Sequence, residues 1–112
     1  MEKWKTPLGF HGTYLISDKG RVMRTGPGRG ATPGAILRHT KTHDGYHTVA
    51  LRHGGEYHRR YVHVLVGEAF ICERVGSMQF NHIDGKKDNN RLSNLEAVTP
   101  KQNMEHAKRM GL

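Results

Sequence analysis

Apolar and polar residues alternate along most of the first half of the chain, a pattern typical of β-strands with one buried face. The runs GTYLIS and RVMRT flank the turn DKG, in which Gly20 can adopt a positive φ, and they predict a short hairpin within residues 1–24. The dipeptides Asp44-Gly45 and Gly54-Gly55 suit tight turns, so two further hairpins are expected around the runs YHTVALR and YHRRYVHV. The pattern predicts a first half built from antiparallel hairpins.

Basic side chains alternate with apolar ones in these last two runs. We expect one face to pack against the core and the other face to present His47, Arg52, His58 and Arg60. A two-stranded ribbon fits the major groove of DNA, so such a face is a candidate for reading DNA. A solvated charged face explains the same pattern equally well.

The spacing of apolar residues changes from the β-strand pattern to a helical pattern in the second half of the chain. In VHVLVGEAFI, residues 62–71, an apolar stripe at helical spacing predicts a short core helix; it consists of Leu65, Val66, Ala69 and Phe70. The Gly- and Pro-rich segment 25–35 shows neither the strand spacing nor the helical spacing of apolar residues. A connector is favoured there over a backbone that contacts a ligand, because nothing in the segment fixes its register.

The last third of the chain predicts a strand, a loop, a second strand and a helix. MQF ends at Asn81-His82, and LEAVT returns as the second strand. Thr99 is expected to cap the helix, because Pro100 follows it and Gln102 stands three residues later, as in a capping box. The loop between the strands is too polar to fold by apolar contacts, so hydrogen bonds from its short side chains should hold it, namely Asp84, Asp88, Asn89, Asn90 and Asn94.

The composition of the chain indicates an anionic partner. The chain has 112 residues, which predicts one domain of mixed α+β class, and its net charge is +8 with the nine histidines neutral. Basic residues are spread from Lys3 to Arg109, which favours a folded surface that meets nucleic acid. A basic pI that serves solubility alone is the alternative.

Other classes of protein are disfavoured by simple absences. Cys72 is the single cysteine, so no internal disulfide or Cys-x-x-Cys zinc site is expected, and a reducing compartment fits. The first residues, MEKWKTPLGF, lack the apolar core of a signal peptide, and no run approaches the roughly 20 apolar residues of a membrane span. We therefore expect no membrane partner.

His82 and the amides around it suggest chemistry on a phosphate. A neutral imidazole can take a proton from water at neutral pH, and amide oxygens are hard ligands that suit Mg²⁺. Asn103 lies in the first turns of the predicted helix, where its side chain could face the end of the first strand and His82. With so little ligand charge, metal binding should be weak without a bound phosphate.

These residues also resemble a known family. The segment VHVLVGEAFI followed by FNHIDGKKDNNRLSNLEAVTPKQN resembles the catalytic module of HNH endonucleases, particularly the phage and intron-encoded homing type with its ββα-metal fold. The specific features are Asn-His, an Asn twelve residues after the His, and another Asn nine residues later within a helix. Upstream, WKTPLGFHGTYLISDKGRVMR resembles the small DNA-binding motif that precedes such modules, so the resemblance covers nearly the whole chain.

The resemblance implies a role for each matching residue. His82 matches the general base that activates water, and Asn81 and Asn103 match the ligands of one divalent metal ion, Mg²⁺ or Mn²⁺. Asn94 matches the middle Asn of the family name, which braces the loop and orients the His through hydrogen bonds. His63 matches a position with a structural or DNA-contacting role. Some relatives carry Asp where this chain has Asn81, and the neutral side chain lowers the expected affinity for metal.

The interpretation is therefore a metal-dependent DNA endonuclease that acts on double-stranded DNA and leaves 5′-phosphate and 3′-hydroxyl ends. Residues 1–60 are expected to hold DNA and residues 61–112 to form the catalytic module. One catalytic centre implies that a monomer nicks one strand, although the chain could act as a monomer or a dimer.

The host cytoplasm is the expected location for a phage-encoded protein. The alternatives are a DNA-binding module without cleavage and, less favoured, an RNA-binding basic protein. The expected DNA contacts are Arg21, Arg24, Arg52, Arg60, His63, Lys86 and Lys87.

Overall fold

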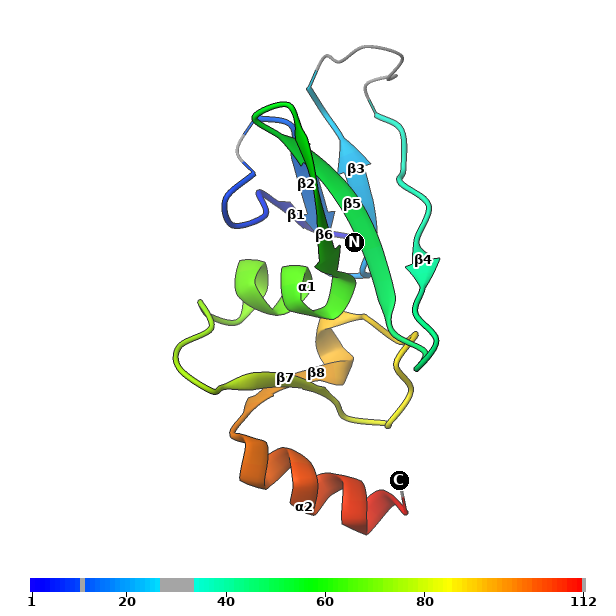
Figure 1. The fold of residues 1–112 in the computed structure, drawn as a ribbon, viewed down its shortest axis with the longest axis vertical. Coiled ribbons are helices and arrows are strands. Elements are labelled where there is room, and N and C mark those ends of the chain that lie inside the picture. The colour runs from blue at the N-terminus through cyan, green and yellow to red at the C-terminus, as the bar shows by residue number, and fades with distance from the viewer. Residues whose placement is uncertain (11, 27–33, 112) are drawn as a thin grey trace.

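The fold is of the predicted mixed α+β class, and the described residues form three small antiparallel sheets and two helices. The structure is a computed structural model that describes residues 1–10, 12–26 and 34–111. In Figure 1 the two sheets of the first half lie at one end, helix α1 lies at the middle, and the strand pair β7–β8 and helix α2 follow toward the other end.

The predicted hairpins form both sheets of the first half. The first sheet contains β1 (Trp4–Lys5), β2 (Tyr14–Ser17) and β3 (Val22–Arg24), and Gly20 in the β2–β3 turn has a φ of 84°. The second sheet contains β4 (Thr40–Lys41), β5 (His47–His53) and β6 (Glu56–Tyr61). Most of the Gly/Pro-rich segment 25–35 lies outside the described residues, so its role as a connector stays a prediction.

The prediction of which basic residues lie on the outer face of the β5–β6 strand pair, or ribbon, is wrong in part. Leu51 pairs with His58 and Val49 pairs with Arg60, so these two basic residues share a face with the buried apolar side chains. Both contact Phe10: the His58 ring lies 6.1 Å from the Phe10 ring and the Arg60 guanidinium lies 5.6 Å from it. His47 has the same parity as these core positions, and of the four predicted residues only Arg52 is on the outer face.

Helix α1 (Val62–Phe70) joins the two halves through a common core. It packs against β2, β5 and β6 on one side and against β7 and β8 on the other, consistent with its central place in Figure 1. The predicted stripe faces the core, with Leu65 and Val66 buried and Ala69 and Phe70 partly buried. Residues from both halves form the buried cluster, namely Phe10, Tyr14, Ile16, Val22, Val49, Leu51, Val62, Leu65, Val66 and Leu95.

The second half follows the predicted order of elements. Strands β7 (Gln79–His82) and β8 (Leu95–Val98) pair in antiparallel fashion, and a short 3₁₀ turn, η1 (Leu92–Asn94), precedes β8. Helix α2 (Pro100–Met110) then begins behind Thr99.

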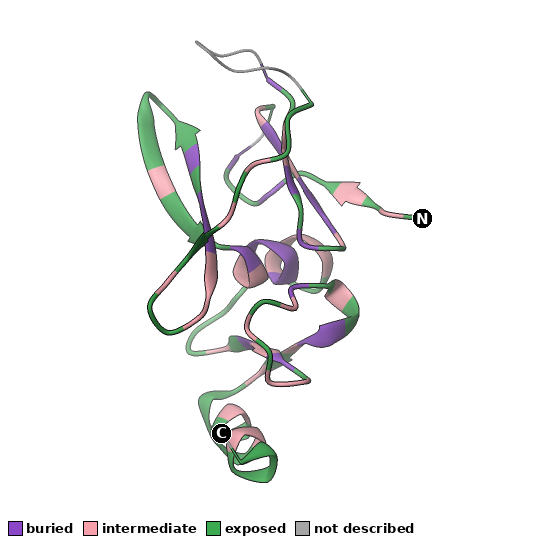
Figure 2. Ribbon diagram, turned by 90° about the vertical axis from the view of Figure 1, so that its right-hand side faces the viewer, coloured by how far each residue is buried: buried purple, intermediate pink, exposed green. Residues whose placement is uncertain are grey.

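The predicted capping box of α2 is present. The Gln102 backbone N–H donates to Thr99 Oγ1 at 3.2 Å, and the Thr99 N–H donates to Gln102 Oε1 at 2.9 Å. Helix α2 buries no residue completely, and Figure 2 shows it as an exposed and half-exposed rod beneath the strand pair. Neither helix of the described residues is long and apolar enough to cross a membrane.

Gly67 is expected to be intolerant of a side chain. A Cβ at this position of α1 would lie 2.5 Å from Phe80 ring atoms, and Phe80 is itself buried in β7. We expect Gly67→Ala to lower the free energy of unfolding by about 1–3 kcal/mol, because overpacking outweighs the helix propensity gained. Urea unfolding measures the change. Gly67→Ala combined with Phe80→Leu should recover part of the loss, and a Gly67→Ala protein more stable than the parent would contradict this contact.

Candidate active site

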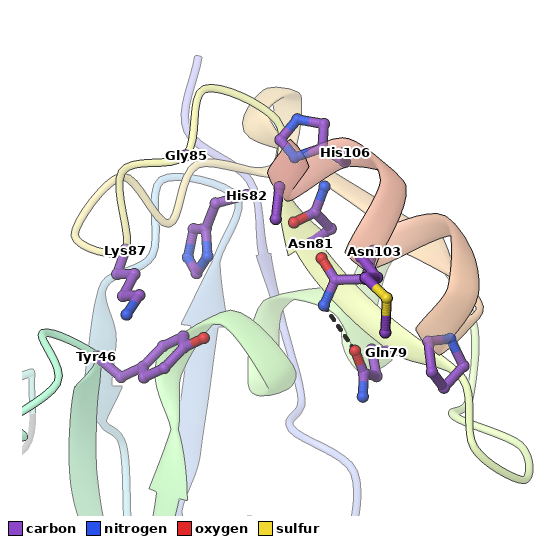
Figure 3. A pocket seen from close by; sticks show the side chains of 11 residues that line it. Tyr46, Gln79, Asn81, His82, Gly85, Lys87, Asn103 and His106 are labelled. Atoms are coloured by element: carbon purple, nitrogen blue, oxygen red, sulfur yellow. Dashed lines mark hydrogen bonds between the residues drawn. The ribbon is translucent and has the colours of Figure 1, made fainter. Parts of the chain in front are cut away.

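A pocket of about 320 Å³ opens between the end of β7, the loop that follows it and helix α2 (Figure 3). It brings together three residues predicted for the site from distant parts of the sequence, Asn81, His82 and Asn103. Tyr46 and Lys87 close the side toward the β4–β5 turn. The residues that line the pocket are Tyr46, Gln79, Asn81, His82, Gly85, Lys87, Pro100, Asn103, Met104, His106 and Ala107.

His82 is the last residue of β7 and is only 5% exposed. Its Nε2 lies 2.8 Å from Oδ1 of Asn90, a buried residue of the loop. An amide oxygen only accepts hydrogen bonds, so Nε2 carries the proton of the neutral ring and Nδ1 carries the lone pair. Burial lowers the pKa of His82 below its ordinary value, and the bond to Asn90 opposes this effect in part. The ring is therefore held neutral, with one nitrogen able to accept a proton.

Asn81 and Asn103 turn their amide oxygens toward the same space. The Asn81 Nδ2 donates to Glu96 Oε1 at 3.0 Å, and the Asn103 Nδ2 donates to Gln79 Oε1 at 2.7 Å. The hydrogen bonds of the nitrogens fix the orientation of both amides, neither oxygen accepts a hydrogen bond from the described residues, and Figure 3 shows both oxygens between the strand end and the helix. The sequence reasoning missed Glu96 and Gln79, although the strand register pairs Asn81 directly with Glu96.

These oxygens fit a hard divalent cation. The described residues hold no group of three His, Cys, Asp or Glu side chains suited to a metal, so any ion here depends on amide oxygens, with the Glu96 carboxylate next to one of them. Amide oxygens are among the ligands used by Ca²⁺ and Mg²⁺. The two oriented amides therefore fit the metal site expected from the sequence, with little negative charge from the protein itself.

The polar loop is held by side-chain hydrogen bonds, as predicted. Asp84 accepts from the Lys86 backbone N–H at 2.8 Å and from Asn89 Nδ2 at 2.8 Å. Asn94 accepts from the Asp84 N–H at 3.1 Å and donates to Asp84 Oδ1 and to the Asn89 carbonyl, each at 2.9 Å. Hydrogen bonds from Asn89, from the Lys86 N–H and from Asn94 lower the pKa of the Asp84 carboxyl to about 2.

Asn94 therefore braces the loop, but the ring of His82 is bound by another residue. Every side-chain hydrogen bond that Asn94 makes within the described chain goes to Asp84 or Asn89. The partner of the His82 ring is Asn90, four residues earlier. Asn94 also bonds the chain directly after His82, because the Ile83 N–H donates to the Asn94 carbonyl at 2.8 Å, so its role in orienting the His stays a prediction, while Asn90 binds the ring.

His63 lies beside His82 and lines a neighbouring pocket, which shares Tyr46, Gln79 and Asn103 with the first pocket. Its ring centroid lies 4.8 Å from that of His82 and 5.3 Å from that of Tyr46, on which it stacks, and the Tyr46 and His82 rings are 6.2 Å apart, so the three rings form one cluster. Burial, helped by the positive charge of nearby groups, lowers the pKa of His63 to about 4, so its ring is neutral at pH 7. His63 therefore packs as an uncharged neighbour of His82; a contact with DNA stays a prediction.

The predicted basic residues are dispersed over the molecule. Lys87 lines the pocket, with Nζ 2.8 Å from the Asp44 carbonyl and 4.7 Å from the Tyr46 ring centroid, whereas Lys86 is exposed on the loop beside it. Arg21 forms an ion pair with Glu2, its Nε lying 2.9 Å from Oε2, and Arg24 lies over the Tyr14 ring. Both arginines belong to the first sheet region, away from the pocket lining.

Arg59 is a basic residue that sequence reasoning did not single out. It pairs with Ala50 on the outer face of the ribbon and donates from Nη1 to Thr48 Oγ1 at 2.8 Å. Arg52 and Tyr57 form the next pair on that face. The alternation of residues between the two faces of a strand could have identified Arg59, because it places Arg59 on the same face as Tyr57 and Tyr61.

A strand pair followed by a helix, with a histidine and two amide oxygens at one pocket, is the ββα arrangement that the sequence resemblance implied. Comparison with family models agrees: residues 60–105 match the HNH endonuclease family and residues 2–52 match the NUMOD4 motif. The chain therefore carries an HNH endonuclease domain preceded by a NUMOD4 motif.

Two of the relatives come from a phage and a prophage. DNA endonuclease I-HmuI of Bacillus phage SP01 is 36% identical over 104 residues, which cover 93% of this chain and 56% of the relative. The prophage-derived protein YosQ of Bacillus subtilis (strain 168) is 44% identical over 72 residues, which cover 63% of this chain and 42% of YosQ. The chain thus spans about half the length of these curated relatives.

A solved structure has the same fold. It is described as DNA binding and cleavage by the HNH homing endonuclease I-HmuI, and it matches with a TM-score of 0.82 at 35% sequence identity. The match covers 97% of this chain and 59% of that chain, so both sheets and the ββα module correspond.

Proposed function

We propose that this protein is a metal-dependent DNA endonuclease that hydrolyses one phosphodiester with His82 as general base. The observation that carries the proposal is the arrangement at the pocket: a neutral His82 whose Nε2 is bound to Asn90, beside two amide oxygens whose nitrogens are occupied. The names of the relatives support DNA as the substrate.

The residues divide the chemistry between them. Nδ1 of His82 takes a proton from a water molecule, whose oxygen forms a bond to phosphorus while the bond from phosphorus to the 3′ oxygen breaks. The 3′ oxygen takes up a proton, which leaves a 3′-hydroxyl and a 5′-phosphate. Asn81 and Asn103 would hold one divalent ion, which when bound neutralises charge on the phosphate and the leaving oxygen.

The outer face of the β5–β6 ribbon is the surface that we propose for double-stranded DNA. It presents Arg52, Tyr57 and Arg59 and ends at Tyr61, which pairs with Thr48. The Tyr61 and Tyr46 rings are 5.6 Å apart, and Tyr46 lines the pocket, so this face leads directly to the site. Lys86 and Lys87 extend the positive charge on the other side. A ribbon of this kind can enter the major groove.

One pocket of this kind in the described residues implies that a monomer nicks one strand in each binding event. A double-strand break would require two copies or two visits. For a phage-encoded nuclease the site of action is the cytoplasm of the bacterial host, where the DNA is.

The metal site predicts opposite effects for two substitutions. Asn103→Ala should raise the metal concentration for half-maximal nicking by about 10-fold or more, because one of few protein ligands is lost. Asn81→Asp should lower it several-fold, because the new carboxylate stands beside Glu96 and a cation relieves their repulsion. Titrations with Mg²⁺ and Mn²⁺ at one salt concentration measure both, with Glu105→Gln on the exposed side of α2 as control. Unchanged midpoints in both variants would place the ion elsewhere.

The low pKa of His82 predicts how nicking responds to acid. A base must be unprotonated, so the rate falls as the pH drops through the pKa of His82, which burial holds below the ordinary 6.5. Rates at saturating metal between about pH 5 and about pH 8 should therefore stay high through 6.5 and decline only below it. A midpoint of the acid limb above 6.5 would contradict this assignment of the base.

A further inference from the structure

The hydrogen bond between Asn90 and the His82 ring has a consequence for which ring nitrogen can act as the base. Asn90 is 4% exposed, and its Oδ1 is the hydrogen-bond partner of His82 Nε2 at 2.8 Å. Neutral imidazole has two tautomers of similar energy in water, and only one of them places the lone pair on Nδ1. The acceptor at Nε2 selects that tautomer, so Asn90 decides which nitrogen can act as the base.

The NUMOD4 segment contacts Asn90 at Gly20. Gly20, in the β2–β3 turn, has a φ of 84°, and a Cβ there would lie 3.0 Å from Asn90 Cβ and 3.1 Å from the Asn90 carbonyl oxygen. The turn is fixed beside the loop, because the Leu92 N–H donates to the Asp18 carbonyl at 2.8 Å and the Gly20 N–H donates to the Ser17 carbonyl at 3.1 Å. The first sheet therefore touches the catalytic loop at the residue that binds the His82 ring.

We propose that Asn90 is the positioning residue of this nuclease and that the Gly20 turn is the wall that holds Asn90 in place. Asn90 keeps the His82 proton on Nε2 and the lone pair on Nδ1. Gly20 is glycine because the backbone must approach Asn90 closely at positive φ. The NUMOD4 segment thus forms part of the catalytic centre in addition to any contact with DNA. The inference rests on the proposed function only where it assigns the base to His82.

The tautomer can be read without DNA or metal. We would record ¹⁵N spectra of the histidine ring nitrogens in the full chain and identify the His82 signals by their loss in His82→Gln. The parent protein should show His82 with a protonated Nε2 and a bare Nδ1. Asn90→Leu, which is similar in size but has no acceptor, should give a mixture of tautomers. Asn90→Asp keeps an acceptor oxygen and should keep the parental tautomer.

Nicking rates complete the test of Asn90. At saturating metal and DNA we expect Asn90→Leu to lose about 10²-fold in rate with unchanged DNA affinity, and Asn90→Asp to stay within about 10-fold of the parent. A parental tautomer in Asn90→Leu, or a mixed tautomer with a parental rate, would overturn the proposal. If the parent chain does not nick at all, the proposed function fails, while the spectra still decide whether Asn90 fixes the ring.

The role of Gly20 is tested with a matched glycine. Gly9 has a φ of 85° and open space around its Cβ position, so Gly9→Ala carries the same backbone strain without the contact. We expect Gly20→Ala to broaden or split the His82 signals and to lower the rate about 10-fold, with Gly9→Ala near the parent in both measurements. Equal behaviour of the two variants would remove Gly20 from the proposal.

Discussion

Replacing His82 by alanine is expected to lower the rate of nicking by about 10²–10⁴-fold, the range typical of a lost general base. DNA affinity should stay near the parental value, because phosphate contacts from basic residues dominate binding and a neutral imidazole adds little to them. Single-turnover nicking and a separate binding titration measure the two quantities.

The control is another histidine. His43 is exposed and does not line the pocket, so His43→Ala should nick at the parental rate. If His82→Ala also cuts at the parental rate, another group acts as the base. If His82→Ala loses binding and cleavage in equal measure, the side chain acts in docking or folding instead of in proton transfer.

Binding to DNA should weaken by about 10²–10³-fold when salt rises from about 50 mM to about 200 mM, as expected for roughly five phosphate contacts that release counterions. The chain carries a net charge of +8, and the ribbon face and the loop beside the pocket place basic side chains next to the site. A flat salt response would argue against the DNA interface altogether.

Single arginines on the two faces of the ribbon sharpen this test. Arg52→Ala and Arg59→Ala should each weaken binding and reduce the salt slope by about 1. Arg60→Ala should have a smaller effect, because its guanidinium lies against Phe10 on the core-side face. Equal effects of all three substitutions would mean that the outer face has no special role in binding.

Local patterns in the sequence were sufficient to predict most of the elements. The turn at Gly20 and the capping box at Thr99 depend on residues next to one another, and both form as predicted. The polar loop was also predictable, because short amides and carboxylates can satisfy backbone groups that no apolar core supports.

The errors concern features that depend on register and on distant contacts. A shift of one residue in strand pairing exchanges the two faces, and the observed register places three of the four residues expected on the outer face, His47, His58 and Arg60, on the core side. Asn90 was identified only as a loop residue, because its bond to His82 follows from the closed shape of the loop. Gly20 and Asn90 are seventy residues apart in the sequence, and the local spacing of apolar and polar residues cannot predict a contact between such distant positions.

The most direct test of the account is conversion of supercoiled plasmid to nicked circles by this chain, measured with Mg²⁺, with Mn²⁺ and with EDTA, and repeated with His82→Ala. The account predicts nicked circles with either metal, none with EDTA, and at least about a 10²-fold slower appearance with His82→Ala. Binding without nicking under every metal condition would contradict the nuclease and leave a DNA-binding module.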